Sequence, residues 1–325
     1  MRSFRHAILP LVAAGAIIAG AAPAGAQSYP SKVIHIIVPF APGGSADLIA
    51  RTIAAKFSDS LGQQTIVENR PAGGGQLGVE MTVNAAPDGH TLLVTPNGTI
   101  TITRHARQLP YDTAKDLAPV SMLATIPAGV AVNDKLPPKT LADFIKYVKE
   151  RPGQLNYAIP TIGTHMHLTG ELLKAASGMN IVAVPYKGTG PAAAALAGGE
   201  VQAGVADLAS LLPHASRGAI RILAVTDPKR TSTAPNIPTA AEAGVPGFGV
   251  QAWIGMFAPA KTPPAIIARV NSEVAKALNM PDVREILTKA GVEPAPSTPD
   301  ALAGVVRDQI DNFGKVIKQA NIRFD

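Results

Sequence analysis

The sequence predicts an α/β fold with mostly parallel sheets, and three observations support this prediction. Short apolar, β-branched runs such as residues 33–38 alternate along the chain with segments whose apolar residues recur every three or four positions. Turns rich in glycine and proline separate the two kinds of segment. The chain has 325 residues, of which 46% are hydrophobic and 16% are charged, so it can bury one large core or two smaller ones. This composition excludes a disordered chain.

The predicted elements follow one another in regular order. The expected strands cover residues 33–38, 64–68, 91–95, 120–123, 129–132, 155–158, 181–184, 201–206, 220–225 and 250–258. The first expected helix follows residue 44, with Ser45 as its N-cap and Gly62 as its stop. The further expected helices cover residues 76–86, 141–151, 164–177, 191–197, 208–215, 264–278, 281–290 and 299–320.

The N-terminus has the pattern of a secretory signal peptide. Arg2 and Arg5 precede an apolar run over residues 7–22, and small residues lead up to Ala26. Cleavage after Ala26 is therefore expected, together with a periplasmic location. A membrane anchor is the alternative, but the run is interrupted by Pro10 and is shorter than the roughly 20 apolar residues of a membrane span. No later segment predicts a membrane span.

Charge and cysteine content exclude several classes of protein. The formal net charge is +6, but residues 1–26 carry two of the basic residues and the others are scattered. Aromatic residues make up only 4% of the chain, so nucleic acid is not an expected partner. The chain has no Cys, which excludes thiolate nucleophiles, iron–sulfur clusters and Cys-type zinc sites.

The loop over residues 39–47 is the strongest candidate for a binding site. It leaves a predicted strand, contains two prolines, Gly43 and Gly44, and opens a predicted helix. Free backbone N–H groups at such a position suit an anion, and ligands of open α/β sheets collect at the carboxyl ends of strands. Ser45 is the expected direct donor, whereas Asp47 is expected to cap backbone groups or orient a water. A plain connection is the alternative, but it does not require this combination of residues.

A second loop, over residues 158–167, follows the same logic because it joins a predicted strand to a helix start. Its His165 and His167 raise the possibility of a metal site. Residues two apart on a helix do not face one another, and no acidic or third His partner is near in sequence. A hydrogen-bonding role is favoured, and no metal is expected.

Residues 73–78 match G-x-G-x-x-G, but they do not predict a nucleotide cofactor. Residues 69–71 separate them from the preceding strand, and no acid occurs between Asp88 and Asp112. No cofactor is expected. No nucleophile motif is present either, so an enzyme is not expected, and a secreted α/β enzyme acting on a carboxylic acid stays a distant alternative.

Several motifs, in register along the whole mature chain, resemble one family. They are YPSK at 29–32, IVPFAPGGSAD at 37–47, VENRPAGG at 67–74, PDGHTLL at 87–93, LPYD at 109–112, PGQLNYA at 152–158, VPYKG at 184–188, PTAAEAG at 238–244 and APAKTPP at 258–264. At these residues the chain is similar to the tripartite tricarboxylate transporter (Bug-type) solute-binding receptors.

The resemblance implies a two-lobed, type II-like periplasmic-binding-protein fold that closes about a hinge. Each lobe would be a mainly parallel sheet flanked by helices, with the ligand cleft between the lobes. Residues 27–126 would form the first part of lobe 1, residues 127–249 lobe 2, and residues 250–325 the return to lobe 1. The implied function is capture of a small carboxylate by a monomeric receptor and its delivery to membrane transporter subunits. Presentation of the closed form to a sensor kinase is the alternative.

The resemblance also implies a set of ligand-binding residues. They are Phe40, Ala41, Gly44, Ser45, Ala46 and Asp47 in lobe 1, and Thr161, Gly163, Thr164, His167, Tyr186 and Asp207 in lobe 2. A structural hydrogen-bonding role for Tyr186 and Asp207 stays open as the alternative.

The chain departs from the family pattern in both loops. Ile159-Pro160-Thr161 stands where the family often has Ser-Ser-Gly, His165 where Thr or Ser is usual, and Ala46 where Thr is usual. A less polar or aromatic carboxylate is one interpretation of the change. The other is that Ile159 and Pro160 only pack the loop.

Overall fold

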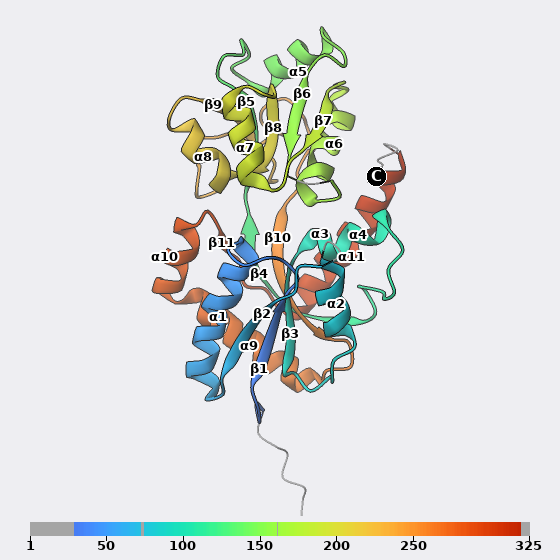
Figure 1. The fold of residues 1–325 in the computed structure, drawn as a ribbon, viewed down its shortest axis with the longest axis vertical. Coiled ribbons are helices and arrows are strands. Elements are labelled where there is room, and N and C mark those ends of the chain that lie inside the picture. Colours follow the sequence, from blue (N-terminus) through green and yellow to red (C-terminus); the bar gives the residue numbers. More distant parts are fainter. Residues whose placement is uncertain (1–28, 73–74, 161, 320–325) are drawn as a thin grey trace, which may run out of the picture.

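The computed structural model describes residues 29–319 except 73, 74 and 161, and these residues form two lobes (Figure 1). Lobe 1 contains a six-stranded sheet with the order β11-β4-β10-β3-β1-β2, and lobe 2 a five-stranded sheet with the order β7-β6-β8-β5-β9. Helices cover both sheets. The expected α/β fold class is therefore confirmed.

The chain builds lobe 1 in two passes and lobe 2 in one. The first pass of lobe 1 contains β1 (Ile34–Val38), α1 (Ser45–Leu61), β2 (Thr65–Asn69), α2 (Gln76–Val83), β3 (Thr91–Pro96), α3 (Asn97–Thr101), α4 (Thr103–Ala106) and β4 (Leu117–Ile126). Lobe 2 contains β5 (Ala128–Asn133), α5 (Leu141–Lys149), β6 (Asn156–Ile159), α6 (His165–Ser177), β7 (Val182–Pro185), α7 (Thr189–Gly198), β8 (Ala203–Asp207), α8 (Leu208–Ala215) and β9 (Ile220–Val225). The second pass of lobe 1 contains β10 (Ala252–Pro259), α9 (Pro264–Asn279), α10 (Pro281–Lys289), β11 (Glu293–Pro294) and α11 (Pro299–Gln319).

The expectation that each sheet is mainly parallel is wrong, because both sheets are mixed. In lobe 1, β1 is parallel to β2 and β3, but β10 is antiparallel to β3 and β4. In lobe 2, β6 is parallel to β7 and β8, but β5 is antiparallel to β8 and β9. The reason is topological. The chain leaves lobe 1 along β4 and returns along β10, so these neighbours run in opposite directions.

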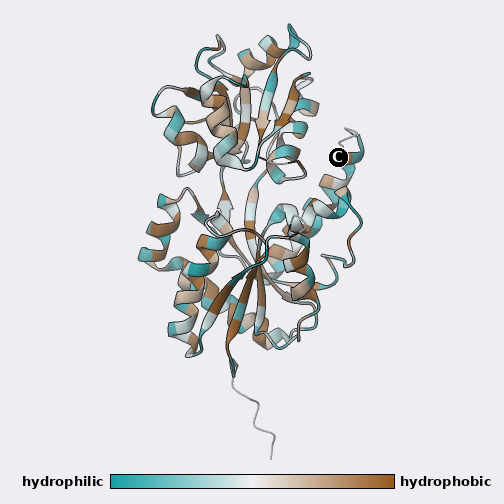
Figure 2. Ribbon diagram, in the orientation of Figure 1, coloured by the Kyte–Doolittle hydropathy of each residue, from teal (hydrophilic) through white to brown (hydrophobic). Residues whose placement is uncertain are grey.

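The apolar residues that predicted the elements form the cores of the lobes. Figure 2 shows hydrophobic strands inside each lobe and more hydrophilic residues on the outer helices. In α1, the i, i+4, i+8 residues Ile49, Ile53 and Phe57 have no exposed surface. The expected N-cap is wrong by one residue, since Gly44 is the N-cap and Ser45 is the first helical residue without a side-chain cap bond. The expected stop is correct, with Gly62 left-handed at φ 67°.

Three segments connect the lobes. Pro127 joins β4 to β5, and residues 226–251 join β9 to β10. These two crossings are tied together, because Thr226 N–H donates to Ala128 O at 2.9 Å and Val250 N–H donates to Thr226 O at 2.8 Å. The third connection is α11, which rises from lobe 1 along the side of lobe 2 (Figure 1).

Candidate functional site: the cleft between the lobes

A cleft with a volume of about 490 Å³ lies between the lobes. Both lobes contribute to its walls. Its lining residues are Phe40, Pro96, Asn97, Gly98, Thr99, Thr103, Ala106, Arg107, Ile126 and Ala252 from lobe 1, and Pro160, Ile162, Gly163, Thr164, His165, Met166 and Thr189 from lobe 2.

The cleft lies at the carboxyl ends of strands. Phe40 follows β1, Asn97 follows β3, Ile126 ends β4 and Pro160 follows β6. Ligands of open α/β sheets bind outside these ends, where backbone groups of the next loop are free of the sheet ladder. The geometry therefore favours this cleft as the ligand site.

The second loop is organised by the first turn of α6. The Thr164 side chain caps the helix by accepting from the backbone N–H of His167, and the Nδ1 atom of His167 lies 3.3 Å from the nitrogen of Gly163, which donates to it. Gly163 has a left-handed φ of 77°, a conformation that favours glycine. Burial lowers the pKa of His167, while Glu171 at 4.0 Å from Nε2 opposes this effect. The ring is therefore neutral at pH 7 and can accept at Nδ1.

His165 connects the two lobes across the cleft. Asn97, which follows β3 in lobe 1, donates through Nδ2 to His165 Nδ1 at 3.0 Å. Burial lowers the pKa of His165 to about 4, so its ring is neutral at pH 7. The Phe313 ring of α11 packs edge-on against it, with 6.1 Å between centroids. The hydrogen bond from Asn97 is consistent with the hydrogen-bonding role that the sequence favours for His165.

The first loop is stabilised by Asp47, which is buried in the first turn of α1. Burial opposes its ionisation, but hydrogen bonds from Arg51, Gly43 N–H and Asn69 hold its pKa below the usual value. The carboxylate is thereby fixed inside the protein, and the Asn69 amide also donates to Phe40 O at 3.1 Å. This arrangement holds the loop shape around Phe40.

The structure places the sequence-predicted residues in different surroundings. Phe40, Gly163 and Thr164 line the cleft. Ala41 and Gly44 are exposed in the loop before α1, Ser45 is half-buried, and Ala46 and Asp47 are buried in α1. His167 is buried behind the second loop, and Thr161 lies outside the described residues.

Tyr186 and Asp207 do not line the cleft. The Tyr186 hydroxyl lies 3.5 Å from a Glu200 carboxylate oxygen, and Asp207 caps α8 by accepting from Ser210 N–H at 2.8 Å. Pro160 lines the cleft, whereas Ile159 is fully buried in the core of lobe 2. Ile159 and Pro160 both depart from the family pattern, but Ile159 packs in the core whereas Pro160 lines the cleft.

The lobe 1 wall contains four cleft residues that the sequence did not predict: Asn97, Thr99, Thr103 and Arg107. A signal was available for the first two, because they directly follow the predicted strand 91–95. The same argument that selected residues 39–47 applies to that strand end. No local pattern pointed to Thr103 or Arg107.

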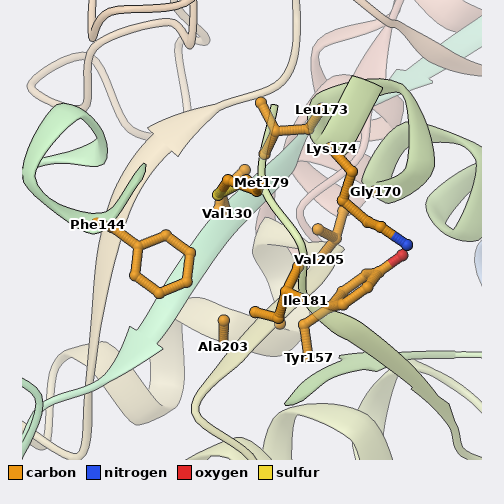
Figure 3. Close-up of a pocket in the computed structure, with 11 residues that line it drawn as sticks. Val130, Phe144, Tyr157, Gly170, Leu173, Lys174, Met179, Ile181, Ala203 and Val205 are labelled. Carbon is orange, nitrogen blue, oxygen red and sulfur yellow. The ribbon is translucent and has the colours of Figure 1, made fainter. Parts of the chain in front are cut away.

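A second cavity lies inside lobe 2 but does not suit a ligand. Its volume is about 20 Å³, enough for a single water. Figure 3 shows its mostly apolar walls, including Phe144, Val130 and Met179, with the Tyr157 hydroxyl and the Lys174 ammonium at one side. Both of these polar groups contact Glu171, at 2.7 and 2.8 Å. This cavity is an imperfection of core packing.

Neither a metal-binding cluster nor a membrane-spanning helix is found among the described residues. Among them, no three His, Asp or Glu side chains come together as metal ligands. In the same part of the chain, every helix is too short or too polar to cross a bilayer. The predicted signal peptide, residues 1–26, lies outside the described residues.

A cleft between two α/β lobes, lined from both sides by strand-end loops, is typical of a solute-binding protein. Residues 49–322 match the tripartite tricarboxylate transporter family receptor, and the chain belongs to this family. The family consists of receptors and not of enzymes. The resemblance found in the sequence and the two-lobed binding-protein fold are thus confirmed.

Relatives are similar over nearly their whole length. Protein BugT of Bordetella pertussis is 36% identical over 305 residues, 93% of this chain and 94% of BugT. A solved periplasmic transporter is 38% identical with a TM-score of 0.80, covering 92% of this chain and 100% of the other. Rpa4515 of R. palustris, solved with adipate, is 35% identical with a TM-score of 0.80, covering 91% and 99%. MatC from Rhodopseudomonas palustris, solved with malate, is 35% identical with a TM-score of 0.75, covering 89% and 100%.

Proposed function

We propose that this protein is a periplasmic receptor that captures a small carboxylate by hinge closure and delivers it to a tripartite tricarboxylate-type membrane transporter. The observation that carries the proposal is the cleft, because its walls come from both lobes. A ligand that contacts both walls binds the closed form better than the open one and shifts the population toward it. Adipate and malate in the solved relatives support a carboxylate.

The backbone N–H groups of two loops are the proposed carboxylate donors. Phe40, Ala41, Gly44, Ser45, Ala46 and Asp47 would contribute from lobe 1, and Thr161, Gly163, Thr164 and His167 from lobe 2. Asp47 and His167 would act by holding their loops, since both side chains are buried. Tyr186 and Asp207 belong to this set only if closure brings them to the ligand.

The apolar part of the cleft favours a ligand with a substantial carbon skeleton. Phe40, Ile162 and Met166 line it, and no acidic residue is among its lining residues in the described chain. An amino diacid would have no carboxylate to pair with its ammonium there. We therefore propose a weakly polar or aromatic acid in place of a compact amino diacid.

Two further parts of the proposal concern the location and the partner. Export would follow from cleavage after Ala26, and the mature receptor would act as a monomer. The closed form would dock on transporter subunits. Pull-down of the ligand-loaded protein with the transporter subunits or with a sensor-kinase ectodomain separates the transport role from the sensing role.

The central test is mass spectrometry of small molecules retained by the natively purified protein, followed by calorimetry. The panel is adipate, malate, citrate, aspartate, terephthalate and nicotinate. We expect micromolar or tighter binding of at least one acid and a smaller radius of gyration with that acid bound. The Ser45 hydroxyl makes no helix-cap hydrogen bond and is proposed as a side-chain donor beside the backbone N–H groups, so Ser45→Ala should weaken binding with unchanged apo stability. Ser58→Ala, near the opposite end of α1, serves as the control for binding. Absence of binding to every acid contradicts the proposal. Tight aspartate binding without adipate or terephthalate binding contradicts the apolar-ligand part alone.

A further inference from the structure

A chain of side-chain hydrogen bonds crosses from lobe 1 to lobe 2 beside the cleft. Trp253 Nε1 of β10 donates to Gln309 Oε1 of α11 at 3.0 Å. The same oxygen accepts from Asn97 Nδ2 at 3.2 Å, and Asn97 Nδ2 also donates to His165 Nδ1 at 3.0 Å. The first three residues belong to lobe 1, whereas His165 begins α6 of lobe 2. These four residues form an interlobe bridge.

The polarity of the interlobe bridge is fixed from its lobe 1 end. An indole N–H can only donate, so Gln309 turns its side-chain oxygen toward Trp253. That oxygen requires the Asn97 amide to present its NH2 group, which makes His165 Nδ1 the acceptor. Burial lowers the pKa of His165 to about 4, so the ring is neutral at pH 7 and can accept. Each bond of the bridge therefore depends on the one before it.

Apolar packing shields the end of the bridge from water. The Asn97 side chain is 1% exposed and His165 is 6% exposed. Ile102, which follows α3, and Phe313 of α11 join the same apolar cluster as Met166 of α6. A hydrogen bond in such surroundings is stronger than one in water, and breaking it leaves buried polar atoms without partners.

The bridge opposes separation of the lobes at this edge of the cleft. Asn97 directly follows β3 and moves with lobe 1, whereas His165 moves with α6, so opening at this edge would break their bond. Gly163 and Thr164 line the cleft and directly precede His165 in the chain. The bridge therefore also holds the second loop at a defined distance from the lobe 1 wall.

We infer that Asn97 and His165 are positioning residues, which hold the second loop against lobe 1 before a ligand arrives and so raise the fraction of receptor in the binding-competent arrangement. This inference rests on the proposed receptor function. The apparent affinity of a ligand is its intrinsic affinity multiplied by that fraction. Gln309 and Trp253 act through Asn97 and not by touching the ligand, because neither lines the cleft.

The first test measures the separation of the lobes without a ligand. The chain has no Cys, so spin labels can be attached to Met81→Cys of α2 in lobe 1 and Ala194→Cys of α7 in lobe 2, both at exposed positions. His165→Phe keeps a ring beside Phe313 but removes the acceptor. In the apo protein this variant should shift the population toward longer label distances by about three- to tenfold, the range for one neutral hydrogen bond.

The second test is calorimetry with the acid of the earlier panel that wild type binds most tightly. His165→Phe should weaken its binding by about the same three- to tenfold. Gln309→Met, similar in shape and without an acceptor, should weaken binding and lengthen the label distances as well, although Gln309 does not line the cleft. The double variant should be no weaker than the weaker single variant, since both changes break one chain of bonds.

Two further variants serve as controls, and thermal unfolding checks that every variant is folded. His165→Asn keeps a side-chain acceptor near the position of Nδ1 and should retain most of the wild-type distances and affinity. His214→Phe makes the same exchange as His165→Phe on α8, outside the cleft lining, and should change neither measurement.

Unchanged label distances and affinities in both His165→Phe and Gln309→Met overturn the inference. Loss of affinity in His165→Phe alone also overturns it, because that pattern indicates a direct ligand contact in place of positioning. The label distances require no ligand. If wild type binds no acid of the panel, the receptor function falls, and the apo distances of the variants still decide whether the bridge holds the lobes together.

Discussion

At the residue scale, His167 makes the second loop sensitive to pH. Its neutral Nδ1 accepts from Gly163 N–H, and burial lowers its pKa from the ordinary 6.5. Protonation would place a hydrogen on Nδ1, where it opposes the Gly163 N–H. The acceptor, and with it the loop shape at the cleft, is therefore expected to be lost as the pH falls below the lowered pKa.

This predicts different behaviour of two His167 variants. His167→Ala removes the acceptor and should weaken carboxylate binding by about threefold to tenfold, the value of one hydrogen bond of about 0.5–1.5 kcal/mol. His167→Asn keeps an acceptor near the position of Nδ1 and should retain most of the affinity without the pH dependence. Calorimetry over a pH series downward from pH 7.5, with His167→Asn measured at each pH, checks this. A ratio of wild-type to His167→Asn affinity that stays constant over the series would contradict it.

At the element scale, α11 is the helix that binds the two lobes together. Leu302 and Val306 near its start pack in lobe 1, whereas Phe313 and Ile317 near its end join the core of lobe 2. Gln309 lies between these pairs and accepts from Trp253 Nε1 at 3.0 Å and from Asn97 Nδ2 at 3.2 Å. A helix of 21 residues is about 30 Å long, enough to span both contacts.

Phe313→Ala should therefore destabilise the whole protein. Its ring is 6% exposed, and loss of a buried Phe side chain costs about 3–5 kcal/mol of unfolding free energy. Lys315→Ala, two positions along the same helix and exposed, should change the unfolding free energy by less than about 0.5 kcal/mol. Urea unfolding of the two variants measures the difference. A Phe313→Ala protein as stable as Lys315→Ala would show that α11 does not hold lobe 2.

At the scale of the whole molecule, the crossings between the lobes contain a buried acid. Asp227 is 4% exposed on the segment that leaves β9, and its Oδ2 accepts from Ala128 N–H at 3.2 Å. Burial raises its pKa to about 7. The folded protein thus holds a proton between pH 4 and pH 7 that the unfolded chain releases, so this group's contribution to stability is lost as the pH rises through that window.

The amide side chain in Asp227→Asn does not ionise, so the loss of stability between pH 4 and pH 7 that Asp227 causes should be absent in this variant. Relative to wild type, its unfolding free energy should increase by up to about 4 kcal/mol between pH 4 and pH 8, from three pKa units at 1.36 kcal/mol each. His165 acts in the opposite sense, because its pKa of about 4 makes stability fall as the pH drops below 6.5. The contribution of Asp227 is therefore read from the difference in unfolding free energy between variant and wild type at each pH, in which the contribution of His165 cancels. A difference that does not change with pH would contradict the raised pKa.

Helices and strands could be predicted because burial of one face of an element gives a periodic pattern of apolar residues in the sequence. The predicted helix 299–320 corresponds to α11 (Pro299–Gln319), and the predicted strand 129–132 lies within β5 (Ala128–Asn133). The helices α3 and α4 were missed, since five and four residues are too few to show a helical period. Both helices contribute to the lobe 1 wall of the cleft, so this part of the site was not predicted from the sequence.

The sequence by itself determined the α/β alternation, the two Gly-containing loops at strand ends and the receptor family. These features depend on residues close together in the chain. The tertiary structure alone decided which residues face one another across the cleft. Asn97 and His165 are 68 positions apart, and Thr103 of lobe 1 lines the same cleft as Gly163 and Thr164 of lobe 2. Such contacts depend on the chain crossing twice between lobes, and a non-local crossing leaves no periodic pattern in the sequence.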